Sequence, residues 1–206
     1  TGACTEAMIQ TMPKAVVKAI RSHLPEQKLT NEDLGREFPD WGVEKIASKT
    51  GIDLRGISGP DECASDLAVC AAEKLFADGV CGPEHVDFII LCTQSPDFLL
   101  PTTACMVQDR LGVPQSAGAL DVNLGCSGFI YSLALAKGLV ETGSARCILL
   151  LTTDTYTKHI HPQDRSVRTI FGDGAAATLV VATETDEEPI GPFVFGTDGR
   201  GAHNLI

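Results

Sequence analysis

The segment from Asp121 to Gly128 is the part of the sequence best suited to chemistry, and it reads Asp-Val-Asn-Leu-Gly-Cys-Ser-Gly. A strand-like run ends there, two glycines flank Cys126, and an apolar helix-like run follows directly. The N–H groups and the positive dipole at a helix start favour the nucleophilic thiolate over the thiol. Gly125 and Gly128 allow close approach of backbone and substrate, and the N–H of Cys126 can stabilise an oxyanion. The pattern therefore predicts a cysteine nucleophile at a strand-turn-helix elbow.

Most cysteines in proteins are small buried hydrophobes, and Cys126 could be one more of them. The glycines beside Cys126 favour the interpretation of this residue as a nucleophile. The buried interpretation is retained for six others: Cys63, Cys70, Cys81, Cys92, Cys105 and Cys147. The eight cysteines of the chain are scattered without a C-x-x-C pair, which favours a reducing, cytoplasmic compartment over a disulfide framework. Asp, His and Cys do not recur at ligand spacing, so no metal site is expected.

Composition narrows the classes of function that need consideration. The 206 residues are 44% hydrophobic and 21% charged, which is typical of a folded domain. A formal net charge of -11 argues against a nucleic-acid partner. The longest apolar runs, such as 88–92 and 147–151, are far too short to cross a membrane. Residues 1–11 are expected to be a leader or a remnant added for expression, with Met12-Pro13-Lys14 as the natural start.

Alternating patterns predict an α/β fold in which strands and helices follow one another. A helix is expected over 65–76, with Ser65 as its cap and Gly79 as its stop. Other helices are expected from Asn31, over 102–111 and over 129–140. Strand-like runs occupy 14–21, 86–92, 118–123, 147–152, 175–182 and 190–195. The last two follow one another without a helix, so the sheet is predicted to be mixed.

Several segments resemble, in order and spacing, the β-ketoacyl-acyl-carrier-protein synthase III group of the thiolase superfamily. Besides the Cys126 segment they are 50–57, 60–67, 101–108, Asp164-Arg165 and 170–175. The resemblance extends from about Lys14 to the end and matches the N-terminal half of the family's two-fold repeat. It implies one thiolase-like domain over 12–206, with a mixed, mostly parallel five-stranded sheet and helices on both faces.

The resemblance also implies an activity, and roles for individual residues. Cys126 would take an acyl group from acyl-CoA and then undergo decarboxylative Claisen condensation with malonyl-acyl carrier protein, with no permanently bound cofactor. Phe171 would line the substrate channel, and Arg165 would pack against the CoA nucleotide. Trp41 lies near the position of a tryptophan that stacks on the adenine. Leu100 replaces a phenylalanine that reaches across the dimer, which predicts a pocket for longer or branched acyl groups.

Two shorter patterns accompany these residues. Lys158, Arg165 and Arg168 against Asp164 give a local charge of 3 - 1 = +2, a small basic patch suited to an anionic cofactor. A solvated charged loop is the alternative interpretation. The turn 172–174, Gly-Asp-Gly, is expected to be scaffolding.

The family's catalytic His and Asn belong to its C-terminal half, which this chain does not contain. Three functions therefore stay open: the condensing enzyme, an acyltransferase without condensation, and a non-catalytic subunit or scaffold. The helix expected over 129–140 is almost entirely apolar and needs cover on every side, so a homodimer or association with the missing half is expected.

Overall fold

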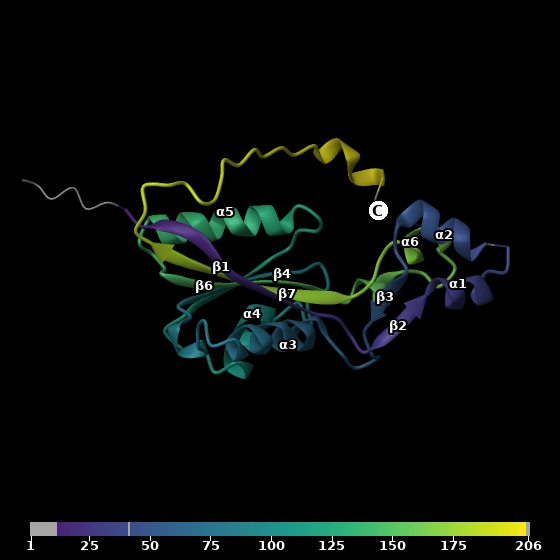
Figure 1. The fold of residues 1–206 in the computed structure, drawn as a ribbon, viewed down its shortest axis with the longest axis horizontal. Helices are drawn as coiled ribbons and strands as arrows, with labels where there is room; N and C mark the ends of the chain where they lie inside the picture. Colours follow the sequence, from purple (N-terminus) through teal and green to yellow (C-terminus); the bar gives the residue numbers. More distant parts are fainter. Residues whose placement is uncertain (1–11, 41, 205–206) are drawn as a thin grey trace, which may run out of the picture.

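The computed structural model describes residues 12–40 and 42–204, and its centre is a five-stranded sheet (Figure 1). The strand order is β1-β7-β6-β4-β5. Strand β4 pairs in parallel with β5 and β6, whereas β7 is antiparallel to both β6 and β1. Only β7 is therefore reversed in this mixed sheet. The strands are β1 (Lys14–His23), β4 (Phe88–Cys92), β5 (Gly118–Val122), β6 (Cys147–Asp154) and β7 (Gly174–Thr183).

Helices cover both faces of this sheet, as expected. Helix α5 (Gly128–Glu141) lies on one face, and α3 (Ala64–Ala77) and α4 (Thr103–Arg110) lie on the other (Figure 1). Successive residues of a strand point to opposite faces, and β6 shows this directly. Ile148 and Leu150 pack with α5, while Leu149 and Leu151 pack with α3 and α4. Burial on both sides explains why β4 and β6 are continuous apolar runs.

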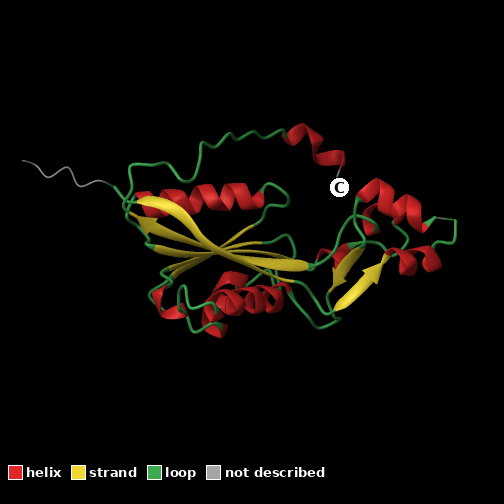
Figure 2. Cartoon of the chain, viewed as in Figure 1, coloured by secondary structure: helices red, strands yellow, loops and turns green. Residues whose placement is uncertain are grey.

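A smaller lobe lies beyond one end of the sheet (Figure 2). It consists of the antiparallel pair β2 (Gln27–Thr30) and β3 (Leu54–Ile57) with α1 (Asn31–Glu37), α2 (Val43–Thr50) and α6 (Arg165–Arg168). Thr30 begins α1 with a capping box, in which its side chain accepts from Asp33 N and the Asp33 carboxylate accepts from Thr30 N. This lobe is built around Leu34, Phe38 and Ile46.

Two expectations about these elements are wrong. Residues 190–195 form no strand, because β7 already lies between β1 and β6 and because Pro192 has no N–H for a ladder. Ser65 does not cap α3. The helix begins one residue earlier with Cys63 as its N-cap, and the Asp66 carboxylate accepts from Cys63 N. Gly79 adopts φ +71° just after the helix, as expected of a stop.

The segment after β7 runs instead along the outer side of α5 (Figure 1). The rings of Tyr131 and Phe195 lie 4.8 Å apart, and Phe193 packs on the core beneath. Ile130 and Leu135 of α5 remain 45% and 48% exposed. The helix is thus only partly covered. Within the described residues, no helix is long and apolar enough to span a membrane.

Candidate functional site

The carboxyl ends of β4, β5 and β6 meet at one edge of the sheet, facing the smaller lobe. Cys92 is in register with both Val122 and Thr152, so the three parallel strands end side by side. Loops that follow parallel strands gather at such an edge, where ligands of α/β proteins bind. The loop with Cys126 follows β5, the loop with Gln94 follows β4, and β6 leads towards α6. This carboxyl edge is the candidate active site.

Cys126 is exposed and lies two residues before the first residue of α5. The turn that carries it is closed by a hydrogen bond of 2.7 Å from Gly128 N to Gly125 O. Among the described residues, the N–H of Cys126 has no acceptor. The exposed sulfur and this N–H therefore lie in the turn between β5 and the apolar helix α5, which is the strand-turn-helix position that the sequence predicted.

The Asp154 carboxylate ties the neighbouring loops together. Its Oδ1 accepts from Gln94 N at 2.8 Å and from Ser95 Oγ at 2.9 Å, and it also accepts from the Thr93 hydroxyl. Ser95 Oγ in turn accepts from Thr155 N at 2.8 Å. These charge-assisted bonds fix the end of β4 against the end of β6. They give the Cys126 loop a rigid neighbour.

Gly125 and Gly128 both lie close to side chains of the β4 end. A Cβ on Gly128 would overlap the Cys92 sulfur and lie 3.2 Å from Leu124 Cβ. A Cβ on Gly125 would lie 2.6 Å from the side-chain oxygen of Gln94. Cys92 is buried, whereas Gln94 is exposed and can move away. A methyl group added at Gly128 should therefore destabilise the folded protein more than one added at Gly125.

We expect Gly128→Ala to lower the free energy of unfolding by about 1–3 kcal/mol, because the buried Cys92 cannot yield. Gly125→Ala should cost less than ~1 kcal/mol, because only an exposed side chain must rotate. Urea denaturation of both variants, followed by circular dichroism, measures the difference. Equal losses in the two variants would contradict the packing described here.

The other cysteines do not share the setting of Cys126. Burial raises the pKa of the Cys92 thiol. The pKa of Cys147 is raised to about 12, mainly by burial and to a smaller extent by the nearby Cys81. The expectation that all six are buried is nevertheless wrong for Cys105, which is exposed on the outer side of α4. Of the six, only Cys92 is fully buried. The other four are half-buried: Cys63, Cys70, Cys81 and Cys147.

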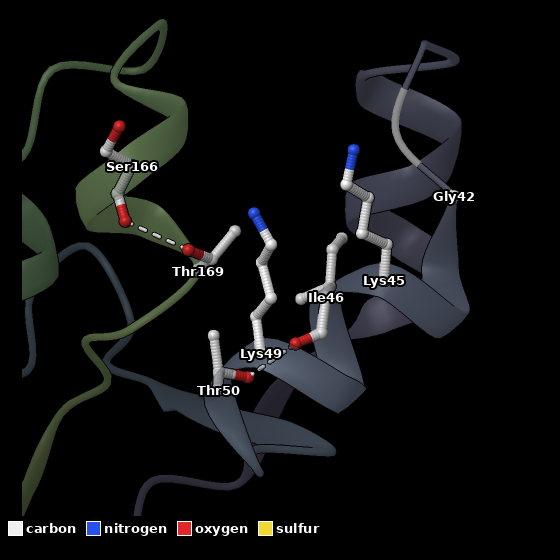
Figure 3. Close-up of a pocket in the computed structure, with 7 residues that line it drawn as sticks. All are labelled: Gly42, Lys45, Ile46, Lys49, Thr50, Ser166 and Thr169. Carbon is white, nitrogen blue, oxygen red and sulfur yellow. Dashed lines mark hydrogen bonds between the residues drawn. The ribbon is translucent and has the colours of Figure 1, made fainter.

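A cleft of about 270 Å³ lies between α2 and α6 in the smaller lobe. Lys45 and Lys49 rise from α2 towards α6, where Ser166 and Thr169 form the opposite wall (Figure 3). Two ammonium groups in a cleft with polar wall residues suit an anionic ligand. The sequence analysis missed both lysines because it did not predict α2. Their i, i+4 spacing, which puts them on one helix face, was the available signal.

Comparison with known proteins shows what this chain is similar to. The description "3-Oxoacyl-[acyl-carrier-protein (ACP)] synthase III" belongs to the family model that matches residues 120–199. The chain is 42% identical over 184 residues to the beta-ketoacyl-[acyl-carrier-protein] synthase III of Caldanaerobacter subterraneus, covering 89% of this chain and 55% of that protein. A crystal structure of a 3-oxoacyl-(acyl-carrier-protein) synthase III aligns with a TM-score of 0.93 and 65% identity, over 94% of this chain and 58% of that one. The chain is thus similar to synthases III over about nine-tenths of its own length.

A second curated relative, from Halalkalibacterium halodurans, is 40% identical over 93% of this chain and 57% of its own length. The chain thus spans a little more than half the length of these curated relatives. The fold is that of the family's solved structures, the thiolase fold, as the resemblance implied.

The residues predicted from the synthase III resemblance lie at different places around the carboxyl edge. The exposed Arg165 has its guanidinium carbon 4.8 Å from the centre of the Phe38 ring, beside the cleft wall formed by Ser166 and Thr169. Phe171 lines a cavity of about 180 Å³ with Leu29, Ile57 and other residues, and its ring centre is 5.0 Å from that of Tyr156.

Leu100 and Trp41 are the remaining predicted positions. Leu100 is 84% exposed in the loop before α4. The start of α4, which follows this loop, is anchored to β5, because the Asp121 carboxylate accepts from Thr103 N and Ala104 N, each at 2.8 Å. Trp41 lies outside the described residues.

The predicted basic patch is not one open surface. Lys158 donates to the carbonyls of Pro60 and Glu62, and Arg168 pairs with Glu37. The Asp164 carboxylate accepts from two N–H groups at the start of α6. Of the three cations, only Arg165 forms no hydrogen bond or ion pair with the described residues. The lysines of α2 supply the positive charge of the cleft.

Proposed function

We propose that the chain forms the acyl-accepting part of a β-ketoacyl-acyl-carrier-protein synthase III. In this proposal Cys126 takes an acyl group from acyl-CoA, and the acyl group then condenses with a malonyl unit on acyl carrier protein. The observation that carries the proposal is the exposed thiol of Cys126 at the head of α5, beside an N–H with no acceptor among the described residues. Similarity to synthases III supports the same chemistry.

The acyl transfer follows from this geometry. The Cys126 sulfur attacks the thioester carbonyl of acyl-CoA, and the carbonyl oxygen becomes an oxyanion within reach of the Cys126 N–H. The oxyanion collapses, the carbon–sulfur bond to CoA breaks, and CoA leaves as a thiol with one proton. The acyl group is then held on Cys126 as a thioester. Asp154 keeps the adjoining loops in place during both steps.

The CoA nucleotide is assigned to the cleft between α2 and α6. Lys45 and Lys49 can pair with its phosphates, and the Ser166 hydroxyl can donate a hydrogen bond to them. Arg165 has one face of its guanidinium towards Phe38 and can stack on the adenine with the other. Phe171, which lines a separate cavity, is assigned to the channel that leads to the thiol.

The condensation step requires residues beyond this chain. The malonyl carboxylate leaves as carbon dioxide, the resulting carbanion attacks the acyl carbonyl, and the Cys126 sulfur is released. By family resemblance, a His and an Asn of the C-terminal half assist this step. We infer that residues 12–206 are the N-terminal half, and that full activity needs both halves.

Incubation with acyl-CoA, followed by intact-mass measurement and assay of free CoA, tests the proposal. We expect one acyl group per chain and one equivalent of CoA released. The full-length protein should then release carbon dioxide from malonyl-acyl carrier protein and form a ketoacyl product. An intact full-length protein that forms no adduct would support a non-catalytic scaffold, and an adduct without condensation would support simple acyl transfer.

We further propose a homodimer, in which Leu100 reaches the acyl pocket of the second copy. Strand β5 lies at an open edge of the sheet, and Phe98, Leu99 and Leu100 are 58%, 96% and 84% exposed. Such an apolar loop is typical of an interaction surface. Light scattering should give twice the mass of the full-length chain.

Leu100→Phe should lower kcat/KM for longer acyl-CoA substrates by about tenfold or more, because the larger ring shortens the acyl pocket. The rate with acetyl-CoA should change little. Priming rates across a series of acyl chain lengths measure this, with Leu99→Phe as the neighbouring control. A wild-type protein that accepts only acetyl-CoA would contradict the assignment of Leu100.

A cytoplasmic location is also part of the proposal. The cysteines at seven described positions are free thiols, which is compatible with a reducing compartment. Acyl-CoA and acyl carrier protein would have to be available in the same compartment.

A further inference from the structure

Arg55 is a buried cation that the proposed chemistry does not use. It lies on β3, is 3% exposed, and its guanidinium donates to protein oxygens only. Nε and Nη2 both donate to Thr169 O, and Nη1 donates to Asn31 Oδ1 at 2.8 Å. Among the described residues, no carboxylate forms a hydrogen bond or an ion pair with it. Burial lowers the pKa of Arg55, which reflects the cost of holding a charge there.

One arm of this network reaches the α6 wall of the cleft. Thr169 follows α6 directly, and its hydroxyl donates to Ser166 O at 2.9 Å. Both residues face the lysines across the cleft (Figure 3). Because two nitrogens of one planar group hold the Thr169 carbonyl, its direction is fixed as well as its distance.

The other arm reaches the α2 wall. Asn31 accepts from Arg55 and donates through Nδ2 to Ile52 O at 2.8 Å. Ile52 follows the end of α2, and its N–H donates to the Thr50 hydroxyl at 3.1 Å. Thr50 is itself a wall residue of the cleft, on the helix that carries Lys45 and Lys49. The two walls thus converge on one guanidinium.

We propose that Arg55 is a positioning residue for the phosphate-bearing end of the substrate, because it holds both walls of the α2–α6 cleft through Thr169 and Asn31. The proposal rests on the function proposed above. A purely structural role would not require a charge here, because a buried ion is often no more stabilising than an apolar residue of similar size. The guanidinium of Arg55 instead fixes the Thr169 carbonyl in one wall and, through Asn31 and Ile52, the end of the helix that carries the two lysines.

Three variants test this role against one control. Arg55→Lys keeps the positive charge but loses the planar guanidinium that bonds both Thr169 and Asn31, and Arg55→Met removes both the charge and these hydrogen bonds. Asn31→Ala removes only the connection to the α2 wall. Arg36→Met is the control, because Arg36 lies on α1 in the same lobe, is largely exposed and pairs only with Asp33. Each protein is checked for folding by circular dichroism and thermal denaturation. Affinity for CoA is measured by calorimetry, and the alkylation rate of Cys126 by iodoacetamide, which does not need the cleft, is measured in parallel.

We expect Arg55→Lys and Asn31→Ala to weaken CoA binding by about tenfold or more, with the alkylation rate of Cys126 changed less than about twofold. In the full-length protein, KM for acyl-CoA should rise while kcat is retained. Arg36→Met should match the wild type. If Arg55→Met does not fold, the milder variant Asn31→Ala still tests whether the network positions the cleft for CoA.

Two results would overturn the proposal while leaving the proposed function intact. The first is unchanged CoA affinity in folded Arg55→Lys and Asn31→Ala. The second is an equal loss of CoA affinity and of Cys126 alkylation, which would indicate a general structural role. By contrast, a wild-type protein that does not bind CoA would contradict the proposed function itself.

Discussion

Cys126→Ala should reduce the rate of acyl transfer from acyl-CoA by at least about a thousandfold, because no other group replaces the nucleophile. The side chain is exposed and lies outside the three clusters of core residues, so the variant should keep its fold. The loss should therefore appear in the rate of CoA release and not in the unfolding curve. Stopped-flow or discontinuous assay of free CoA, with circular dichroism alongside, measures the two quantities separately.

Cys105→Ser is the matched control for this prediction. Cys105 is also an exposed thiol, but it lies in the first turn of α4, which a long loop separates from β4, and not in a tight turn between a strand and a helix. Its replacement should leave the rate within about twofold. A Cys126→Ala protein that still releases CoA at the wild-type rate, or a Cys105→Ser protein that does not, would assign the acyl group to another residue.

The second large effect is on stability, and it concerns Asp173. This carboxylate is 2% exposed and joins three parts of the molecule at the base of the smaller lobe. It accepts from Ser58 N and Ser58 Oγ at 2.8 and 2.6 Å, and from Thr157 N and Thr157 Oγ1 at 2.9 and 2.6 Å. The turn 172–174 was expected to be scaffolding, and these four bonds give Asp173 that role.

We expect Asp173→Ala to lower the free energy of unfolding by about 3–5 kcal/mol, because two buried donors of Ser58 and two half-buried donors of Thr157 lose one shared acceptor. Asp164→Ala is the comparison, since Asp164 caps α6 through two N–H groups in a more open position. It should cost about 1 kcal/mol. Urea denaturation of both variants measures the difference, and a loss below about 1 kcal/mol for Asp173→Ala would mean that water satisfies the freed donors.

The strands and helices around the core could be predicted because local pattern and tertiary environment agree there. Strand β6 is apolar on both faces and is buried on both faces, and α3, α4 and α5 were found within one or two residues. Strands β2 and β3 were missed because each has four residues, with only Arg55 and Gly56 buried. Helix α2 follows Gly42, which provides no side-chain cap, and it buries only Ile46. The sequence pattern that would predict this helix is therefore weak.

The candidate site likewise has residues that could be predicted from local sequence and residues that could not. Cys126 was found because its signal is local, with glycines between a strand and an apolar helix. The cleft was missed because Lys45 and Ser166 are 121 positions apart in the sequence and meet only through the fold. Arg55 was noted only within a family segment, since neither its burial nor its bonds to Thr169 and Asn31 can be inferred from local pattern.

Peptide mapping of the acylated protein tests the central claim most directly. After incubation with acyl-CoA and digestion, tandem mass spectrometry locates the acyl group at a single residue. We predict a thioester on Cys126, with the buried Cys92 and the high-pKa Cys147 unmodified. An acyl group mapped reproducibly to Cys105 or to any lysine, with Cys126 free, would contradict the account.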